Sequence, residues 1–117
     1  MNTVASVLAR KKMVPVTVAP GTTVMQALQI MAEKNIGSVI VLEGEHYKGI
    51  VTERDYSRKI ILKGKSSTDT LVEEIMSTDL PGIKPSDSIE HCMALMTQLN
   101  IRYMPVFEGN KLTGLIS

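Results

Sequence analysis

The first part of the chain contains short β-branched runs and one long amphipathic stretch. Val14 to Val18 is rich in valine, which predicts a strand that Pro20 and Gly21 end. Thr23, with Gln26 three residues later, forms a capping box, so we expect a helix to begin there. Apolar residues then recur at helical spacing, and Asn35 is expected to end the helix in the left-handed conformation. These apolar residues are Val24, Ala27, Leu28 and Met31.

The segment that follows alternates strand and turn signals before a second helix. Ile36 to Leu42 is almost wholly apolar, which is typical of a strand buried on both faces. Glu43 to Lys48 contains Gly44 and is predicted to be a turn, and Gly49 to Val51 is the predicted return strand. Thr52 is expected to open a helix that runs through Ile61 and stops at Gly64.

The chain repeats itself at an offset of 65 residues, which aligns 18–52 with 83–117 without a gap. The second copy is therefore predicted to hold a strand at Ile83, a helix over 89–100, a strand over 101–107 and a return strand near Leu115. Leu71 to Met76 is predicted to be a helical turn that leads into it, and Val72, Ile75 and Met76 correspond to Val4, Val7 and Leu8. The identical pairs are Pro20/Pro85, Met31/Met96, Asn35/Asn100, Ile36/Ile101, Val41/Val106, Glu43/Glu108, Gly44/Gly109 and Gly49/Gly114.

Neither copy can bury its sheet and helix faces alone. We therefore expect an α+β body in which two β-α-β-β-α repeats, residues 1–65 and 66–117, pack as a pseudo-two-fold pair with a cleft between their sheets. The second repeat is expected to lack its last helix, and a complete copy would need about a dozen further residues.

Composition narrows the function classes. Apolar residues make up 44% and charged residues 21%, as in ordinary globular proteins, and 13 basic against 12 acidic residues argue against general nucleic-acid binding. No apolar run reaches the ~18 residues of a membrane span. The N-terminus lacks the features of a secretory signal, so a cytoplasmic location is expected.

Cysteine, histidine and methionine show no catalytic or metal-binding pattern. Cys92 is the sole cysteine and lies on a predicted helix face, where a buried, unreactive thiol is expected. His46 and His91 have no evident partner, so no metal site or catalytic triad is predicted. Core filling is the expected role of the methionines at helical positions, which are Met25, Met31, Met93 and Met96.

The segment Gly49–Asp55 is the most informative for function. A strand is expected to end and a helix to begin at Thr52, where unpaired backbone N–H groups suit a phosphate. The Thr52 hydroxyl can add a donor, Arg54 can contact a phosphate with two hydrogen bonds, and Asp55 can accept from both hydroxyls of a ribose. The alternative is purely structural, because Thr52-x-x-Asp55 also resembles a capping box.

The ordered repeats resemble a tandem pair of CBS domains, the cystathionine-β-synthase module. The matching segments are PGTTVMQALQIMAEKNIGSVIV with GIVTERD, and PSDSIEHCMALMTQLNIRYMPV with GLIS. GIVTERDYSRKIILKGKSS is also similar to small stand-alone CBS-pair proteins of bacteria and plant organelles. The resemblance implies adenosine-containing ligands in the clefts between repeats, with the Thr or Ser and the Asp of the motif on phosphate and ribose. It also implies homodimers joined through helices.

Carried over by position, the resemblance implies two sets of cofactor-binding residues. In the second set Ser117 supplies the hydroxyl, and the position equivalent to Asp55 falls beyond residue 117. The first set is Thr52, Arg54, Asp55, Gly37, Ser38, Val39, Met76, Ser77, Leu80, Pro81 and Gly82. The second is Met13, Val14, Pro15, Val16, Arg102, Tyr103, Met104, Pro105 and Ser117.

The sequence favours a non-catalytic regulatory module that binds an adenine nucleotide (AMP, ADP, ATP or NAD) without a metal and signals as a homodimer. Arg54 favours a phosphorylated ligand over S-adenosylmethionine, whose sulfonium is positive. One alternative is a structural or protein-binding adaptor with vestigial clefts. Another is a small nucleotide-processing enzyme, against which stand the lack of a Walker A loop, a dinucleotide fingerprint and a nucleophile–base pair. Neither nucleic acid nor membrane is an expected partner, and the sequence names no regulated protein.

Overall fold

The computed structural model describes residues 2–11 and 14–117. The chain forms two compact units. One is continuous, Val16–Asp79, and the other joins Met1–Pro15 to Leu80–Ser117. We call them the continuous unit and the split unit. These units do not coincide with the predicted boundaries 1–65 and 66–117. The segment that leads into each repeat, which we call the lead-in segment (1–15 or 66–79), belongs to the unit that holds the strands of the other repeat.

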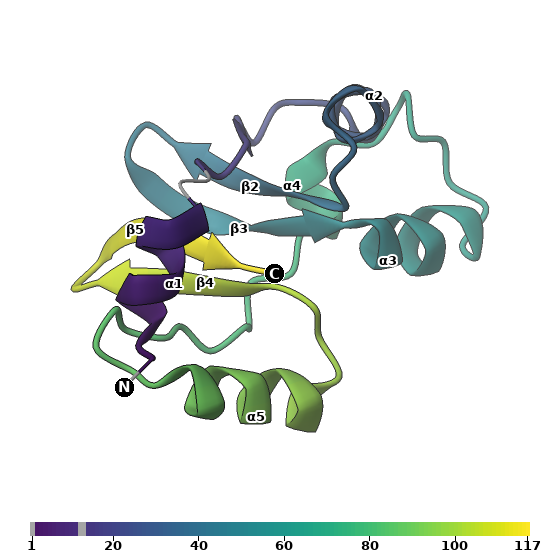
Figure 1. The fold of residues 1–117 in the computed structure, drawn as a ribbon. Helices are drawn as coiled ribbons and strands as arrows, with labels where there is room; N and C mark the ends of the chain where they lie inside the picture. The colour runs from purple at the N-terminus through teal and green to yellow at the C-terminus, as the bar shows by residue number, and fades with distance from the viewer. Residues whose placement is uncertain (1, 12–13) are drawn as a thin grey trace. The chain divides into compact units, whose positions relative to one another are not determined.

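The continuous unit contains a three-stranded sheet with the order β1-β2-β3, of which Figure 1 labels the neighbouring strands β2 and β3. β1 (Thr17–Val18) runs parallel to β2 (Ser38–Glu43), and β2 pairs antiparallel with β3 (His46–Thr52). β1 is shorter than the predicted strand over 14–18, in part because Pro15 has no N–H to donate. Pairing with β2 still reaches one residue further, since the Ile40 N–H donates to the Val16 carbonyl at 2.9 Å.

Helices cover this sheet as the capping signals predict. α2 (Val24–Lys34) begins with both hydrogen bonds of the Thr23–Gln26 capping box, and Asn35 ends it at φ 53°. α4 is the short helix Val72–Ile75.

The predicted helix after Thr52 is present, but its second half is wider than an α-helix. α3 (Glu53–Tyr56) continues into the π-type helix η1 (Ser57–Ile61). In η1 the Leu62 N–H donates to the Ser57 carbonyl, five residues back, at 3.0 Å. Gly64, at φ 66°, follows the helix as expected.

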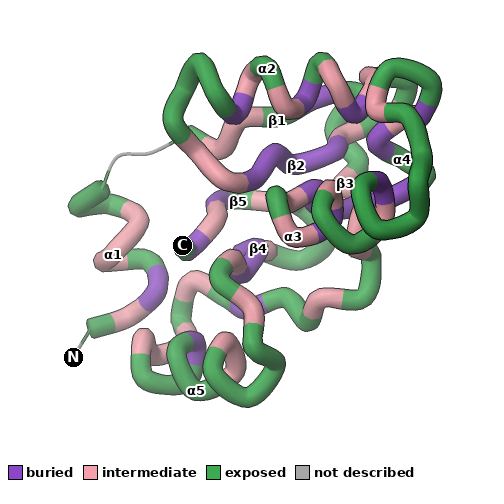
Figure 2. The backbone as a smooth tube through the Cα atoms, turned by 90° about the vertical axis from the view of Figure 1, so that its right-hand side faces the viewer, coloured by how far each residue is buried: buried purple, intermediate pink, exposed green. Residues whose placement is uncertain are grey.

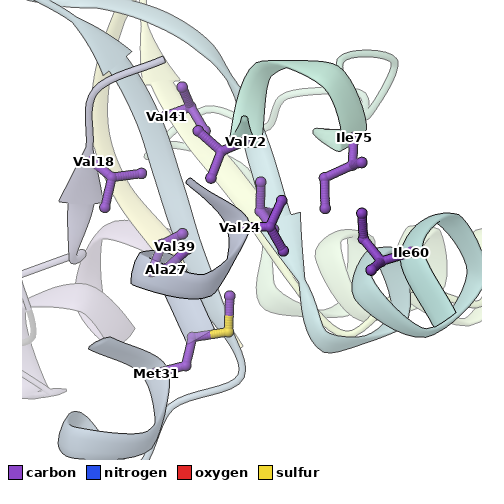
Figure 3. Packing of buried hydrophobic residues seen from close by; sticks show 10 residues of the cluster. Val18, Val24, Ala27, Met31, Val39, Val41, Ile60, Val72 and Ile75 are labelled. Carbon is purple, nitrogen blue, oxygen red and sulfur yellow. The ribbon is translucent and has the colours of Figure 1, made fainter. Parts of the chain in front are cut away.

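Side chains from the sheet and from three helices meet in one core (Figure 3). β2 is buried along most of its length (Figure 2), as its apolar sequence predicts. In η1, Ile60 belongs to the core, whereas the adjacent Ile61 is 56% exposed. The core consists of Val18, Val24, Ala27, Met31, Val39, Val41, Val51, Ile60, Val72 and Ile75.

The split unit repeats this arrangement with fewer strands. β4 (Met104–Glu108) and β5 (Lys111–Ile116) form an antiparallel pair, with α5 (Ile89–Leu99) and α1 (Val4–Lys11) as its helices. The strand predicted at Ile83 is reduced to one parallel bridge with Val106. Its core consists of Val4, Ile83, Cys92, Met104, Val106 and Ile116.

The exchanged lead-ins make equivalent contacts in the two units. In the continuous unit the Val72 N–H donates to the Thr22 carbonyl at 2.8 Å, and in the split unit the Val4 N–H donates to the Asp87 carbonyl at 2.9 Å. Val4 aligns with Val72 and Asp87 aligns with Thr22, so the two hydrogen bonds are equivalent. The side-chain cores show why the exchange is required: Val4 of α1 and Val72 of α4 are both fully buried.

The prediction that Met93 fills the core is wrong. Met93 is 60% exposed, because the buried side of α5 is centred on Cys92 and the next residue turns toward solvent. The prediction for Cys92 is confirmed: its side chain is buried, and desolvation, with the charge of Asp87, raises the pKa of its thiol.

Candidate functional site

The compact units gather most of each predicted set. Of the first set, only Leu80, Pro81 and Gly82 fall outside the continuous unit. Of the second set, Val14, Pro15, Arg102, Tyr103, Met104, Pro105 and Ser117 lie in the split unit and Val16 in the continuous unit. Met13 lies outside the described residues. The exchange of lead-ins explains this grouping, since it places Met76 and Ser77 in the same unit as Thr52 and Asp55.

Asp55 is the centre of the first set. It lies at the start of α3 and is buried, with 8% of its side chain exposed. Its Oδ2 atom accepts hydrogen bonds from the Thr52 N–H at 2.9 Å and from the Thr52 hydroxyl at 3.1 Å, and the Asp55 N–H donates to Thr52 Oγ1 at 3.1 Å. The capping box that the sequence offered as the structural alternative is therefore present.

The other carboxylate oxygen of Asp55 has two further donors. Oδ1 accepts from the Ser77 hydroxyl at 2.9 Å and from the Lys59 ammonium, also at 2.9 Å. Lys59 Nζ donates in addition to the Ile75 carbonyl at 2.7 Å. A buried carboxylate is thus compensated by one cation, two hydroxyls and one backbone N–H.

Lys59 was not among the predicted site residues. The ion pair of Lys59 with Asp55 could have been predicted from the sequence, because an acidic residue and a lysine four positions later are neighbours on a helix. The contact of Lys59 with the Ile75 carbonyl, however, depends on the docking of α4 and could not be read from local spacing.

Ser77 reaches Asp55 because its backbone adds to the edge of the sheet. The Ser77 N–H donates to the Ile50 carbonyl at 2.8 Å, and the Ile50 N–H donates to the Ser77 carbonyl at 3.1 Å. Gly49 permits this approach: a Cβ there would lie 2.8 Å from the Ser77 carbonyl oxygen and 3.0 Å from Met76 Cγ. Gly49, Met76 and Ser77 therefore form one contact, between β3 and the segment that follows α4.

Gly37 and Ser38 lie beside the start of α3. The Glu53 N–H donates to the Gly37 carbonyl at 3.1 Å, and Ser38, which is buried, pairs with Thr52 in the β2–β3 register. These contacts correct one expectation, because the backbone N–H groups of Glu53 and Asp55 are already bonded within the chain. An anionic group at this site would depend on side chains to a greater extent than the sequence suggested.

Val39 and Met104 are 1% and 0% exposed and belong to the cores of the continuous and the split unit. Their contribution to a ligand site stays a prediction.

The residues that the structure describes contain no group of three or more His, Cys, Asp or Glu side chains placed to hold a metal ion. Among those same residues, no helix is long and apolar enough to cross a membrane.

Comparison with known proteins assigns the chain to a family. The family model described as CBS domain matches it twice, over residues 4–62 and 72–117. The chain belongs to the CBS domain family. CBS pairs are regulatory modules, and the prediction of a tandem CBS pair with an α+β fold is confirmed.

Relatives of this CBS pair include bacterial and plant proteins. The chain is 35% identical over 101 residues to the CBS domain-containing protein YhcV of Bacillus subtilis, covering 86% of this chain and 71% of that protein. It is 38% identical over 100 residues to the mitochondrial protein CBSX3 of Arabidopsis thaliana, covering 81% of this chain and 48% of the plant protein. The chain thus spans about half the length of that plant relative.

Solved structures support the same fold. A protein with CBS domains from Burkholderia ambifaria is 45% identical with a TM-score of 0.92, over 99% of this chain and 88% of that one. The CBS domain pair of protein MJ0100, solved in complex with 5′-methylthioadenosine and S-adenosylmethionine, is 21% identical with a TM-score of 0.83, over 100% of this chain and 90% of that one. At that identity the second likeness concerns the fold alone.

The two CBS repeats differ at their motifs. In the first, Gly49 to Asp55 holds the complete pattern, and Thr52 and Asp55 are joined by three hydrogen bonds. In the second, the pattern starts at Gly114 and reaches the exposed Ser117 after β5. Among the described residues, the first motif brings a hydroxyl and a carboxylate together.

Proposed function

We propose that this CBS pair is a non-catalytic sensor module that binds an adenosine-containing ligand, either an adenine nucleotide (AMP, ADP or ATP) or NAD, through the first motif. The observation that carries the proposal is the carboxylate of Asp55, which is buried and lies beside the hydroxyls of Thr52 and Ser77. Asp55 accepts hydrogen bonds from the ribose hydroxyls, and Thr52, whose N–H and hydroxyl both donate to Asp55, holds that carboxylate in place beside the phosphate. The complex of the MJ0100 CBS pair with two adenosine derivatives supports this choice of ligand class.

Other predicted residues complete the proposed site to different degrees. Gly37, Ser38, Met76 and Ser77 lie around the start of α3 and provide backbone and side-chain contacts. Arg54, which is half-buried and follows Thr52 by two residues, contributes positive charge toward a phosphate. Val39 contributes through its backbone, since its side chain is in the core.

Calorimetric titration with AMP, ATP, NAD and S-adenosylmethionine tests the proposal. We expect sub-millimolar binding of at least one phosphorylated ligand, weakened about tenfold or more by Asp55→Asn, because a hydrogen bond to a charged group contributes about 1.5–3 kcal/mol. Glu53→Gln is the matched control, since Glu53 is an exposed carboxylate on the same helix turn. Lack of binding by the wild type, or equal binding by the Asp55 variant, would refute the proposal.

The competing function is a structural or protein-binding adaptor. It is favoured by one observation, namely that donors of Thr52, Ser77 and Lys59 already occupy both oxygens of the Asp55 carboxylate. An adaptor would bind none of the four ligands, while Asp55→Asn would still lower its stability. Chromatography of the titrated ligands separates both functions from an enzyme, because only an enzyme would convert them.

We further propose that the module signals as a homodimer. Ile61 and Leu62 are 56% and 75% exposed at the end of η1, although the preceding Ile60 is in the core. Two adjacent exposed aliphatic side chains favour burial against a second copy. Sedimentation velocity should show a dimer for the wild type and a shift toward monomer for Leu62→Glu, with Met93→Glu in the split unit as the control.

A further inference from the structure

The acceptor capacity of Asp55 is fully used within the chain. A carboxylate offers about four lone-pair sites. Oδ2 accepts two hydrogen bonds from Thr52, and Oδ1 accepts one from Ser77 and one from Lys59. A ribose whose hydroxyls donate to Asp55 must therefore replace a donor that is already in place.

The four donors differ in how easily they can leave. The bonds from Thr52 hold the start of α3, and one of them comes from the backbone. Ser77 is held by two backbone hydrogen bonds to Ile50. Lys59, by contrast, has a flexible four-carbon stem and is 42% exposed, so its ammonium can leave Oδ1 while it keeps its hydrogen bond to the Ile75 carbonyl.

Displacement would leave the Lys59 ammonium beside the site. Its second hydrogen bond, to the Ile75 carbonyl at 2.7 Å, anchors Nζ there. A partly buried ammonium that loses its carboxylate needs another anion. The phosphate of the same nucleotide can take that place, whereas uncharged adenosine cannot.

We propose that Lys59 is a specificity-determining residue that pairs with Asp55 and transfers to the phosphate of an adenine nucleotide when the ribose hydroxyls engage Oδ1. This proposal rests on the proposed function and adds a ligand class to it: adenosine ligands that carry a phosphate. The exchange keeps both charges compensated, because the ribose hydroxyls replace the ammonium at Asp55 and the phosphate replaces Asp55 at the ammonium.

Calorimetric titration of AMP, adenosine and S-adenosylmethionine into the wild type, Lys59→Gln and Lys63→Gln tests the exchange. For the wild type we expect tighter binding of AMP than of adenosine. Lys59→Gln should reduce that preference about tenfold, because one charge-assisted hydrogen bond is lost. Lys63→Gln, which changes an exposed lysine on the same segment, should leave the preference unchanged, and Lys59→Arg should retain most of it.

Chemical acetylation of the wild-type protein, read by mass spectrometry, supplies a test that does not depend on the folding of a variant. Adenosine should raise the reactivity of Lys59 relative to Lys63, and AMP should lower it. An unchanged AMP preference in folded Lys59→Gln, or equal effects of AMP and adenosine on Lys59 acetylation, overturns this proposal while the proposed function stands. If the wild type binds none of the adenosine ligands, the proposed function itself fails, and the role of Lys59 fails with it.

Discussion

The continuous and the split unit share a scaffold but differ in chemistry. Each has an antiparallel strand pair, one long helix that ends in a left-handed asparagine, and a lead-in helix from the other repeat. Two of the aligned positions at which they differ bear on the site. Ser77, which donates to Asp55 in the continuous unit, corresponds to Ala9 in the split unit, and Gly37 corresponds to Arg102.

This difference shows that the repeat preserves packing more strictly than it preserves a site. Gly49 and Gly114 both admit a side chain of the lead-in segment, Met76 in one unit and Leu8 in the other. A hydroxyl or carboxylate at the neighbouring positions is not required for that packing. The continuous unit can therefore carry a polar cluster without changing how its lead-in segment packs.

The largest expected effect tests the exchange of lead-ins. Val4→Ala and Val72→Ala should each cost about 2–3 kcal/mol of unfolding free energy, because both side chains are fully buried and their truncation leaves cavities. Amide hydrogen exchange should localise the loss: Val4→Ala should reduce protection in β4 and β5, and Val72→Ala in β2 and β3. If Val4→Ala instead weakened β2 and β3, the lead-in would belong to its own repeat.

The next prediction compares Gly49 and Gly114, the two glycines against which the lead-in segments pack. Gly49→Ala should cost about 2 kcal/mol, because the new Cβ would lie 2.8 Å from the backbone oxygen of Ser77, a residue that two backbone hydrogen bonds to Ile50 hold in place. Gly114→Ala should cost less, about 1 kcal/mol, since it meets only the flexible end of Leu8. Urea unfolding measures both, and equal costs would mean that the two approaches are equally rigid.

A smaller effect is expected where the units differ chemically. Ser77→Ala should cost about 1 kcal/mol, because Asp55 loses one of its hydrogen bonds. The reverse change, Ala9→Ser, should stay within about 0.5 kcal/mol, since Ala9 is exposed. Thermal unfolding of the Ser77→Ala and Ala9→Ser variants measures both losses of stability. Equal losses would contradict this prediction.

The last effect appears only at high pH and concerns Tyr47, which aligns with Leu112. Burial raises the pKa of Tyr47 to about 12 from 10.0, so the unfolded chain releases this proton at lower pH than the folded chain. The contribution of Tyr47 to stability is therefore complete below pH 10 and is lost as the pH rises toward 12. Thermal unfolding at pH 9 and pH 11 should show a smaller decrease for Tyr47→Phe than for the wild type; equal decreases would mean that Tyr47 contributes nothing to this dependence.

Local sequence signals predicted the elements well where the physics is local. The capping box at Thr23, the left-handed residues Asn35 and Asn100, and the turn at Gly44 are all observed. The errors occur where packing decides the outcome. Nothing in the spacing of Met93 distinguished it from a core residue, and its exposure follows from the side of α5 that meets β4 and β5.

The sequence by itself determined the repeat, the family and the pairing of Thr52 with Asp55, because these depend on identity and on spacing along the chain. Only the tertiary structure decided that each lead-in completes the core of the other repeat's strands. It also decided that Lys59 and Ser77 converge on the same carboxylate oxygen. The physical reason is that burying Val4 and Val72 requires partners distant in sequence, and the docking of α4 then delivers Ser77 and the Ile75 carbonyl to the start of α3.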